Sequence, residues 1–440
     1  MDVIAKMPTY EAYKESGYEW IGNVPSSWDI SKLGSCLFPV SIKNHPDQPL
    51  LSITREQGVI QRDVEDQDSN HNYIPDDLSG YKLLKEGQFG MNKMKAWQGS
   101  YGVSSFTGIV SPAYFVFDFI KPISPSFFNW AIRSKLYVSF FGSASDGVRV
   151  GQWDLSKSRM KVIPFLIPST EEQTLIANFL DQKAAHIDEA IAIKEQQIAL
   201  LKERKQIIIQ KAVTQGLNPD VPMKDSGVDW IGEIPAHWAI SKIGHYARVY
   251  NGSTPSRDSK RYWENGTIPW MSSGKVNEYL ISTPSELITE SAFRECSLRF
   301  FPKGTVLVGI VGQGKTRGTS ARLAIDAAIN QNVAGIIPSD ELLSEFLHQY
   351  LIQAYDEVRN CGQGSNQEAL NCQILSAFKI AFPPAVEQKN IVDFIAGQSE
   401  SINKAIGLQL LQIEKLREYK TTLINSAVTG KIRITPEMVE

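Results

Sequence analysis

The sequence predicts an α+β fold in which two mixed α/β domains, related by a pseudo-two-fold axis, are joined by two long antiparallel coiled-coil helices. Three observations predict this fold. The chain has 440 residues, whereas an ordinary domain has about 100–200 residues, so more than one domain is expected. A short motif occurs twice, and so does a long helix-forming segment. Each half of the chain therefore carries motif, variable region and helix in the same order.

The short motif spans residues 14–34 and 224–244, at an offset of 210 residues. Twelve of its 21 positions are identical, including two tryptophans and one proline. The variable regions that follow, roughly 35–163 and 245–380, look little alike. A duplicated frame with divergent inserts indicates that the frame performs one shared task, whereas the inserts differ in what they recognise.

The helix-forming segment repeats at an offset of 215 residues. Its first copy, Gln173–Thr214, has no Pro or Gly and consists largely of strong helix formers. Ser169 or Thr170 provides an N-cap, with acidic residues in the first turn. Gly216 provides a stop.

The second copy begins after Pro383 and Pro384 and ends near Gly430. Gly397 and Gly407 lie inside it, and each costs about 1 kcal/mol of helix stability. We therefore expect the first part of this helix to be irregular.

Apolar positions in both helices step by four and three, which is typical of a coiled-coil seam. Polar residues interrupt the two seams at matching places, as register-setting positions do. The seam positions are Ile187, Ile191, Lys194, Ile198, Leu201, Lys205, Ile208 and Ala212, and Ile402, Ile406, Gln409, Ile413, Leu416, Lys420, Leu423 and Ala427. Two amphipathic helices in separate cores are the alternative, but 42 residues span about 63 Å, too long for most compact domains.

Chain connectivity predicts that the two helices run antiparallel. The first helix ends just before the second motif, and the second helix starts directly from the second variable region. The predicted segments are a first domain at 1–165, a helix at 168–216, a second domain at 217–382 and a helix at 384–430. Strands are expected at 114–119, 305–310 and 332–337, and short helices at 127–136 and 341–359.

Composition excludes several classes of protein. The most apolar run, Val306–Val311, is far shorter than the ~20 residues of a membrane span, and Met1–Tyr10 has no apolar segment of a signal peptide. The four cysteines show no metal-binding spacing, so we expect neither disulfides nor zinc. Reduced cysteines are typical of a cytoplasmic protein, and we expect that location here. The net charge of −3 is low for a nucleic-acid binder, but residues 149–161 and 294–322 are locally basic.

Basic, amide and aromatic side chains in the variable regions are candidates for contact with nucleic acid. Cations suit phosphates and guanine edges, and Gln or Asn suits adenine edges. The alternatives remain open: a solvated turn with core aromatics at 254–264, and tight turns at 147–152 and 362–367. The candidates are Lys93, Lys95, Arg149, Gln152, Lys157 and Arg159, and Arg257, Lys260, Arg261, Tyr262, Lys315, Arg317, Gln363 and Asn366.

Residues Gly309–Thr316 match the pattern GxxxxGK[ST] of a phosphate-binding loop and follow an apolar strand. That pattern alone would indicate an NTPase. However, the residues after it are a poor helix start, and no hydrophobic strand with a Mg²⁺-binding acid lies at a useful distance. We interpret Lys315 and Arg317 as phosphate contacts to DNA. No methyltransferase, nuclease or metal-binding motif is present, so neither catalytic nor metal-ligating residues are predicted.

The chain resembles the specificity subunits of type I restriction-modification enzymes. The resemblance rests on the WIGxxPxxW motif (Trp20–Trp28, Trp230–Trp238), the segments from Phe165 to Gln173 and from Ala381 to Gln388, the long helices and the Gly-Gln-Gly-Lys-Thr-Arg-Gly loop. It covers nearly the whole chain.

The resemblance implies a non-catalytic subunit with two target recognition domains, each reading half of a split site in double-stranded DNA. The helices would set the gap between the halves. Methyltransferase and restriction/translocase subunits would be the partners, using S-adenosylmethionine, and ATP with Mg²⁺, respectively, while this chain would bind no cofactor. The competing hypotheses are an NTPase and a coiled-coil scaffold with two protein-binding heads.

Overall fold

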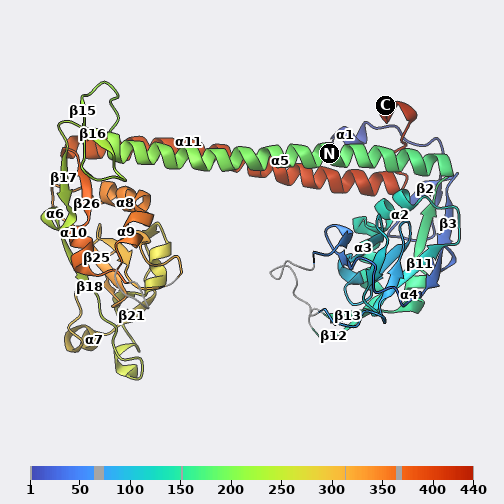
Figure 1. The fold of residues 1–440 in the computed structure, drawn as a ribbon, viewed down its shortest axis with the longest axis horizontal. Helices are drawn as coiled ribbons and strands as arrows, with labels where there is room; N and C mark the ends of the chain where they lie inside the picture. Colours follow the sequence, from blue (N-terminus) through green and yellow to red (C-terminus); the bar gives the residue numbers. More distant parts are fainter. Residues whose placement is uncertain (1, 64–73, 150–151, 313, 363–368, 440) are drawn as a thin grey trace. The chain divides into compact units, whose positions relative to one another are not determined.

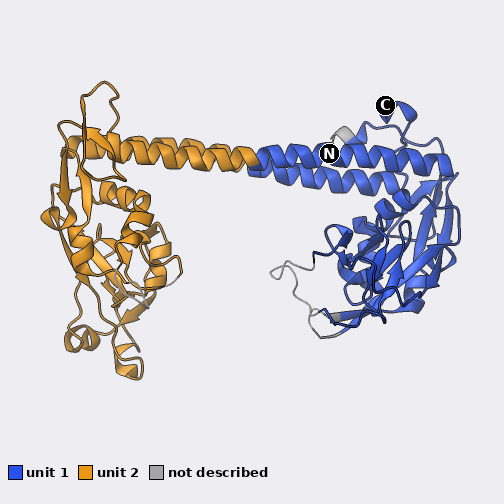
Figure 2. Ribbon diagram, viewed as in Figure 1, with its two compact units in different colours: residues 1–195, 410–440 blue, residues 196–409 orange. Residues whose placement is uncertain are grey.

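The computed structural model describes residues 2–63, 74–149, 152–312, 314–362 and 369–439, except for the side chains of residues 2, 3, 148, 149 and 152. Contacts divide the chain into two compact units, shown in Figure 2: unit 1 holds Met1–Glu195 and Leu410–Glu440, and unit 2 holds Gln196–Gln409. Each unit contains one variable region and part of both long helices. No helix in the described part of the chain is long and apolar enough to cross a membrane.

The domain in unit 1 is built on a four-stranded antiparallel sheet in the order β4-β11-β8-β9. Figure 1 labels its second strand, β11. The four strands are Leu37–Val40, Tyr114–Phe119, Phe89–Asn92 and Tyr101–Val103. Aromatic residues form its core: Phe128 of helix α2 (Pro125–Ile132) contacts Phe89 at 5.1 Å and Phe165 at 4.9 Å between ring centroids. The sheet therefore holds one helix against its face through ring contacts.

The domain in unit 2 has the same strand order with one strand added, β18-β25-β22-β23-β20. The strands are Ala247–Asn251, Val333–Pro338, Val306–Gly309, Ser320–Leu323 and Leu280–Ile281. The first four pair antiparallel, and β20 joins β23 in parallel. The two variable regions therefore share a core topology although their sequences look little alike.

The other elements complete the two domains. Further strands are β1 (Tyr13–Glu15), β2 (Asn23–Pro25), β3 (Asp29–Lys32), β5 (Leu51–Thr54), β6 (Gly58–Gln61), β7 (Lys82–Leu84), β10 (Gly108–Val110), β12 (Ser145–Arg149), β13 (Gln152–Leu155), β14 (Pro164–Ile167), β15 (Met223–Asp225), β16 (Glu233–Pro235), β17 (Ala239–Lys242), β19 (Ile268–Met271), β21 (Glu286–Ile288), β24 (Ala328–Ile329) and β26 (Lys379–Phe382). Further helices are α1 (Asp2–Ala5), α3 (Lys135–Ser143), α4 (Lys157–Lys161), α6 (Ile243–Tyr246), α7 (Glu290–Glu295), α8 (Ser344–Gln353), α9 (Tyr355–Asn360) and α10 (Cys372–Ala377).

The three predicted strands correspond to β11, β22 and β25 and are confirmed. The two predicted short helices are each broken in two. The helix expected at 127–136 ends at Ile132, and α3 begins at Lys135. The helix expected at 341–359 is divided into α8 and α9 at Ala354. Composition alone did not reveal these breaks, because no Pro or Gly marks them.

Both long helices are confirmed. Helix α5 runs from Thr170 to Gln215, and helix α11 runs from Ala385 to Val428. Ser169 caps α5: its Oγ accepts from the backbone N–H of Glu172 at 3.3 Å. Gly216 and Gly430 follow the two helices with φ of 76° and 69°, the left-handed conformation typical of a helix stop.

The expectation of an irregular start to α11 is wrong, since the helix continues through Gly397 and Gly407. Buried residues of the same helix account for this continuity, because Ile391 and Ile395 precede Gly397, Ile402 lies between the glycines and Ile413 follows Gly407. Packing therefore outweighs the low helix propensity of glycine here.

The two helices pair antiparallel in unit 1, because partner numbers on α11 fall as those on α5 rise. In unit 1, Asp188 bonds Lys420 and Glu195 bonds Arg417. In unit 2, Lys205 Nζ donates to Asn403 Oδ1 at 3.2 Å. Every predicted seam position is buried or half-buried, and the lysines of the polar layers bond polar groups of the opposite helix. The seam prediction is confirmed.

A matched joint attaches each domain to its helix. In unit 1, Gln173 Oε1 accepts from the N–H of Ser124, the N-cap of α2, at 2.7 Å, and Nε2 donates to the carbonyl of Pro168 at 3.0 Å. In unit 2, Gln388 makes the same bonds to Leu343, the N-cap of α8, and to Pro383, at 2.7 and 3.0 Å. Both glutamines are buried.

The repeated motif completes this joint. Trp28 Nε1 donates to Glu172 at 3.4 Å, and Trp238 Nε1 donates to Glu387 at 2.9 Å. Both indoles are fully buried and hold the first turn of the long helix. The two repeats in the sequence therefore meet at one structural junction, which explains why they recur together.

Candidate nucleic-acid interface

Two polar loops lie together in each domain. The strand loop follows the third strand in the sheet order, at residues 93–100 after β8 and at 310–319 after β22. The helix loop follows α3 at residues 144–155 and α9 at 361–370. In unit 1 the N–H of Leu155 donates to the carbonyl of Lys93 at 3.2 Å, and in unit 2 the N–H of Leu370 donates to Ile310 at 2.9 Å. The same backbone bond therefore joins the two loops in both domains.

In unit 1 the helix loop is the hairpin of β12 and β13, in which Asp146 lies opposite Asp154. Two predicted DNA-binding cations neutralise these acids. Arg159 bonds Asp146, and Lys93 Nζ lies 3.2 Å from Asp154. The pairing raises the pKa of Arg159 through its hydrogen bond to Asp146 and lowers the pKa of that carboxyl. Since like charges opposite each other destabilise a hairpin, these two cations stabilise the loop itself.

A lysine cluster adjoins this hairpin. Lys82 Nζ donates to the carbonyl of Tyr114 at 2.6 Å, and Lys157 Nζ lies 4.5 Å above the ring of Phe115. The pKa of Lys82 is lowered, first by burial and then by the nearby charges of Lys157, Lys43 and Lys93. A group of cations held this close on a surface favours an anionic partner.

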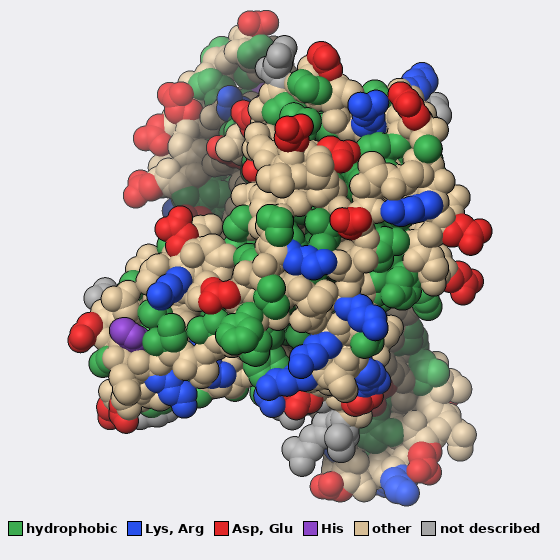
Figure 3. Space-filling model, turned by 90° about the vertical axis from the view of Figure 1, so that its right-hand side faces the viewer, with side chains coloured by type: hydrophobic (Ala, Val, Ile, Leu, Met, Phe, Trp, Pro, Cys, Tyr) green, Lys and Arg blue, Asp and Glu red, His purple; other side chains and the backbone are tan. Residues whose placement is uncertain are grey.

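Sequence reasoning found Lys93 and Lys157 but missed Lys43 and Lys82. Lys82 lies in an apolar strand, and nothing in its sequence context separates it from a solvated lysine. Lys95 was predicted and is exposed in the strand loop. Figure 3 shows Lys and Arg side chains gathered in the lower half of the face in view, with hydrophobic side chains between them.

Arg149 and Gln152 belong to the strands of the same hairpin. Their side chains lie outside the described part of the structure. The hairpin is fastened to the strand loop by Trp153, which stacks on Trp97 with centroids 5.1 Å apart.

The strand loop of unit 2 is the segment that matches a phosphate-binding pattern. It connects β22 to β23, which pair antiparallel, so the loop belongs to a hairpin. A phosphate-binding loop instead leads from a strand into a helix, whose N-terminus holds the phosphate. The NTPase hypothesis is therefore disfavoured by the local fold.

The predicted residues of these unit 2 loops have different positions. Lys315 is exposed. Arg317 is only 7% exposed, so the expectation that its guanidinium contacts phosphate is not supported by this conformation. Gln363 and Asn366 lie outside the described residues. The described ends of their loop, at 362 and 369, are brought beside the Lys315 loop by α9 and by the Leu370 bond.

The remaining predicted cations of unit 2 pack against α7 and β21. Arg257 makes two bonds to Glu286 at 2.6 and 2.8 Å, and its guanidinium lies 3.8 Å from the centroid of Trp263. Arg261 and the Tyr262 hydroxyl both bond Glu295, at 2.5 and 2.8 Å. Lys260 lies 3.9 Å from Glu264. Contacts within the domain hold these residues. This agrees with the alternative given above for residues 254–264, a turn with core aromatics.

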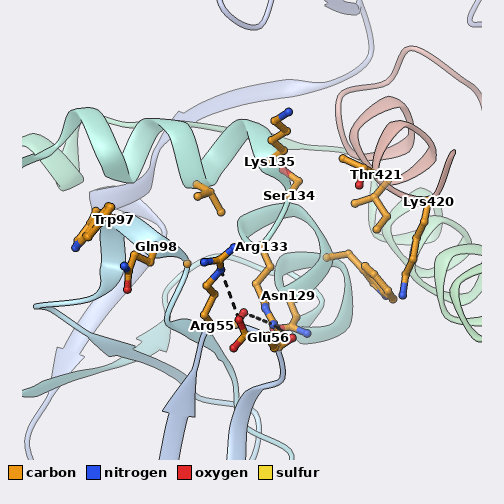
Figure 4. Close-up of a pocket in the computed structure, with 14 residues that line it drawn as sticks. Arg55, Glu56, Trp97, Gln98, Asn129, Arg133, Ser134, Lys135, Lys420 and Thr421 are labelled. Atoms are coloured by element: carbon orange, nitrogen blue, oxygen red, sulfur yellow. Dashed lines mark hydrogen bonds and ion pairs between the residues drawn. The ribbon is translucent and has the colours of Figure 1, made fainter. Parts of the chain in front are cut away.

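A pocket of about 840 Å³ lies in unit 1 between the domain and α11 (Figure 4). Arg133 projects toward the turn after β5, where its Nη2 donates to the carbonyls of Arg55 and Glu56 at 3.1 and 2.7 Å. Glu56 is the only carboxylate among the lining residues. Arg133 therefore bonds the backbone, and the lining residues include no second carboxylate and no histidine to form an acid–base pair with Glu56. Among the described residues, no cluster of His, Cys, Asp or Glu could hold a metal ion.

The fold and its loops define a class of protein: two domains of one topology, each with its own polar loops, on a duplicated helical frame. Comparison with known proteins finds relatives with this organisation. The family model for the type I restriction modification DNA specificity domain matches residues 235–412. A type I restriction enzyme MjaIX specificity subunit from Methanocaldococcus jannaschii is 33% identical over 208 residues, or 44% of this chain and 46% of that protein.

Other relatives match over the whole chain. The putative MjaX specificity subunit of the same organism is 23% identical over 444 residues, covering 96% of this chain and 98% of its own. A solved chain, from a structure of complex assembly and conformational transition in the type I R-M system, has the same fold, with a TM-score of 0.70 and 15% identity over 92% of this chain and 98% of that one. Residues 235–412 therefore resemble a type I restriction modification DNA specificity domain, and nearly the whole chain shares the fold of the solved type I R-M chain.

Proposed function

We propose that residues 1–165 and 217–382 are target recognition domains, each of which binds one half of a bipartite site in double-stranded DNA. The observation that carries this proposal is the matched pair of polar loops, joined by the same backbone bond in both domains. An equivalent scaffold with different side chains suits two readers of different half-sites.

In the first domain, Lys82, Lys95 and Lys157 would contact phosphates, while Arg149 and Gln152 would reach base edges. Among the described residues, no carboxylate pairs with Lys82, Lys95 or Lys157. Cations in this state release counterions when they meet phosphate, which makes binding salt-dependent. In the second domain, Lys315 and the segment containing Gln363 and Asn366 would have these roles.

We propose that methyltransferase subunits dock on the long helices and that restriction/translocase subunits join the assembly. Large apolar side chains on the helices support this, since exposed apolar surface of this kind marks protein interfaces. They are Ile193, Leu200 and Ile207 on α5, and Leu408, Leu410 and Leu411 on α11. S-adenosylmethionine, ATP and Mg²⁺ would be bound by those partners and not by this chain. We also propose a cytoplasmic location, because the cytoplasm holds the DNA of a bacterium or archaeon.

The test of the proposed function is DNA binding by the chain with its methyltransferase partner. A random library with two variable half-sites and gaps of different length would be selected against the complex. We expect one bipartite sequence to be enriched, with affinity that falls steeply as salt rises. Lys157→Ala should lower affinity about equally for all sequences and reduce the slope of log Kd against log salt by about 1.

A matched control is Lys404→Ala, since Lys404 Nζ lies 2.7 Å from Glu400 on α11, outside both domains. Its salt slope should not change. Equal affinity for every duplex in the library would instead favour a scaffold with two protein-binding heads.

Docking on the helices is tested separately. Leu200 is 63% exposed, and Leu200→Lys should abolish co-purification of the methyltransferase subunit, because a charge in the centre of an apolar interface is left unpaired. Gln196→Lys, an exposed polar position on the same helix, is the control. Undiminished co-purification of the Leu200 variant would exclude this surface.

A further inference from the structure

The strand loop of unit 2 is held by one face of α9. Arg359 Nη1 donates to the carbonyls of Gly314 and Arg317 at 2.7 and 3.1 Å. The hydroxyl of Tyr355, one turn earlier, donates to the carbonyl of Lys315 at 3.1 Å. Three carbonyls of the loop are therefore bonded by two side chains of a single short helix.

The two side chains also bond each other, since Arg359 Nη1 lies 3.1 Å from the Tyr355 hydroxyl. The guanidinium of Arg359 is thus directed inward to loop carbonyls. Bonds from a charged donor are roughly twice as strong as neutral ones. The guanidinium of Arg359 is consequently engaged by the backbone of the loop.

Glycines let the loop approach α9 and fold on itself. Gly318 has φ of 84°, and a Cβ there would lie 3.3 Å from the carbonyl oxygen of Tyr355. A Cβ on Gly309 would lie 2.2 Å from the carbonyl oxygen of Thr316, closer than real contacts allow. Both glycines therefore allow close backbone approaches in a loop whose Lys315 is exposed.

We propose that Tyr355 and Arg359 are positioning residues that hold Gly314, Lys315 and Arg317 of the strand loop in the arrangement that presents Lys315 to DNA. This inference rests on the proposed function, because it assumes that the strand loop contacts DNA. Neither residue was singled out by sequence analysis. Tyr355 and Arg359 contact no DNA in this proposal and act only through the loop.

The first domain is held differently at the equivalent place. Gly99 of its strand loop has φ of 95° and faces Val138 of α3, where an added Cβ would lie 3.3 Å from Cγ2. The stacked indoles of Trp97 and Trp153 take the place of hydrogen bonds. Loss of Arg359 should therefore affect only the half-site read by the second domain, and the other half-site provides an internal control.

The experiment compares Arg359→Gln, Tyr355→Phe and Lys315→Ala in the full chain with its methyltransferase partner. Binding to the selected duplex is measured across a range of salt concentrations. Lys315→Ala should lower affinity and reduce the salt slope by about 1. Arg359→Gln should lower affinity by roughly 10-fold, as the loss of a charged hydrogen-bond donor does, with an unchanged slope. Tyr355→Phe should have a smaller effect of the same kind.

Combining Arg359→Gln with Lys315→Ala should cost little more affinity than Lys315→Ala alone, because both act at one contact. A reduced salt slope in Arg359→Gln would overturn the proposal, since Arg359 would then itself contact phosphate. Unchanged affinity would also overturn it. Equal weakening at both half-sites would show a general loss of folding and count against a positioning role.

Amide hydrogen exchange of the free complex separates this inference from the proposed function. Arg359→Gln should accelerate exchange in residues 309–319 and leave 93–100 unchanged. If the wild-type complex shows no sequence-specific binding, the proposed function fails and the DNA role of the loop fails with it. Unchanged exchange with intact DNA binding would instead overturn the positioning role alone.

Discussion

His348 lies in the core of the second domain and is 1% exposed. Its Nε2 is 3.2 Å from the carbonyl of Ser320, and Tyr279 packs on its ring. Burial lowers the pKa of His348 to about 4, while the bond to Ser320 and the charge of Glu345 oppose that shift and the charge of Arg322 adds to it. The histidine is therefore neutral in the folded domain at neutral pH.

This pKa predicts acid sensitivity. The folded pKa is below the ordinary value of 6.5, so the unfolded chain binds the proton more tightly. The contribution to stability is complete above pH 6.5 and is lost as pH falls from 6.5 toward 4. Compared with His348→Gln, wild type should lose about 2 kcal/mol more of its unfolding free energy between pH 7.5 and 4.5. Urea unfolding at the two pH values measures this, and equal losses would contradict it.

Single cations illustrate what sequence reasoning can and cannot predict. Residue type and local composition identified Lys157 and Lys315, which are exposed in the structure. They did not reveal that Arg159 and Lys93 neutralise hairpin acids or that Arg317 is buried. Those outcomes depend on which residues the fold brings opposite each other, and that information is absent from a linear pattern.

The long helices were predictable because their signals are local: composition, caps and the step of the apolar positions. The breaks between α2 and α3 and between α8 and α9 were not, since tertiary packing sets them. The shared strand order of the domains was hidden as well. It depends on pairing between distant strands whose sequences diverge.

The glycines of α11 offer a test at the scale of one helix. Gly397 and Gly407 are exposed, and a Cβ on either would meet no atom within 4 Å. Alanine at each position should raise the unfolding free energy by about 0.5–1 kcal/mol, because it restricts the unfolded chain and favours the helix. Thermal unfolding of the single and double variants measures this. A lowered melting temperature would indicate that α11 needs these glycines for another reason.

The glutamine joints provide a second test on elements. Gln173→Ala or Gln388→Ala removes two donor or acceptor groups from a buried site and leaves backbone partners unsatisfied. We expect each substitution to cost about 3 kcal/mol and to free the helix N-cap that the glutamine holds. Gln182→Ala, at an exposed position of α5, should change stability by less than about 0.5 kcal/mol. Denaturant unfolding compares the three, and equal losses would contradict the joint.

At the scale of the whole molecule, connectivity predicted antiparallel helices, and the paired residues confirm it. The proposed role of the helices as a spacer makes a quantitative prediction. Deleting seven residues from α5 and seven from α11 preserves the seam register and removes about 10 Å of helix. The gap between selected half-sites should shorten by about 3 base pairs, at 3.4 Å each.

Library selection with the shortened chain measures this gap. The half-site sequences should stay the same, because neither domain is altered. An unchanged gap would refute the spacer role, and altered half-sites would show that the deletion disturbed the domains.

The joint between domain and helix is built from glutamine, glutamate and tryptophan residues that lie outside the variable regions. Substitutions in the strand loop or the helix loop consequently leave the attachment of each domain to its long helix intact. If the domains read DNA as proposed, substitutions in one variable region would change the target sequence without altering the helices on which partner subunits are proposed to dock. This independence of the two parts follows from the positions of Gln173 and Gln388, which are buried at the joints and outside the variable regions.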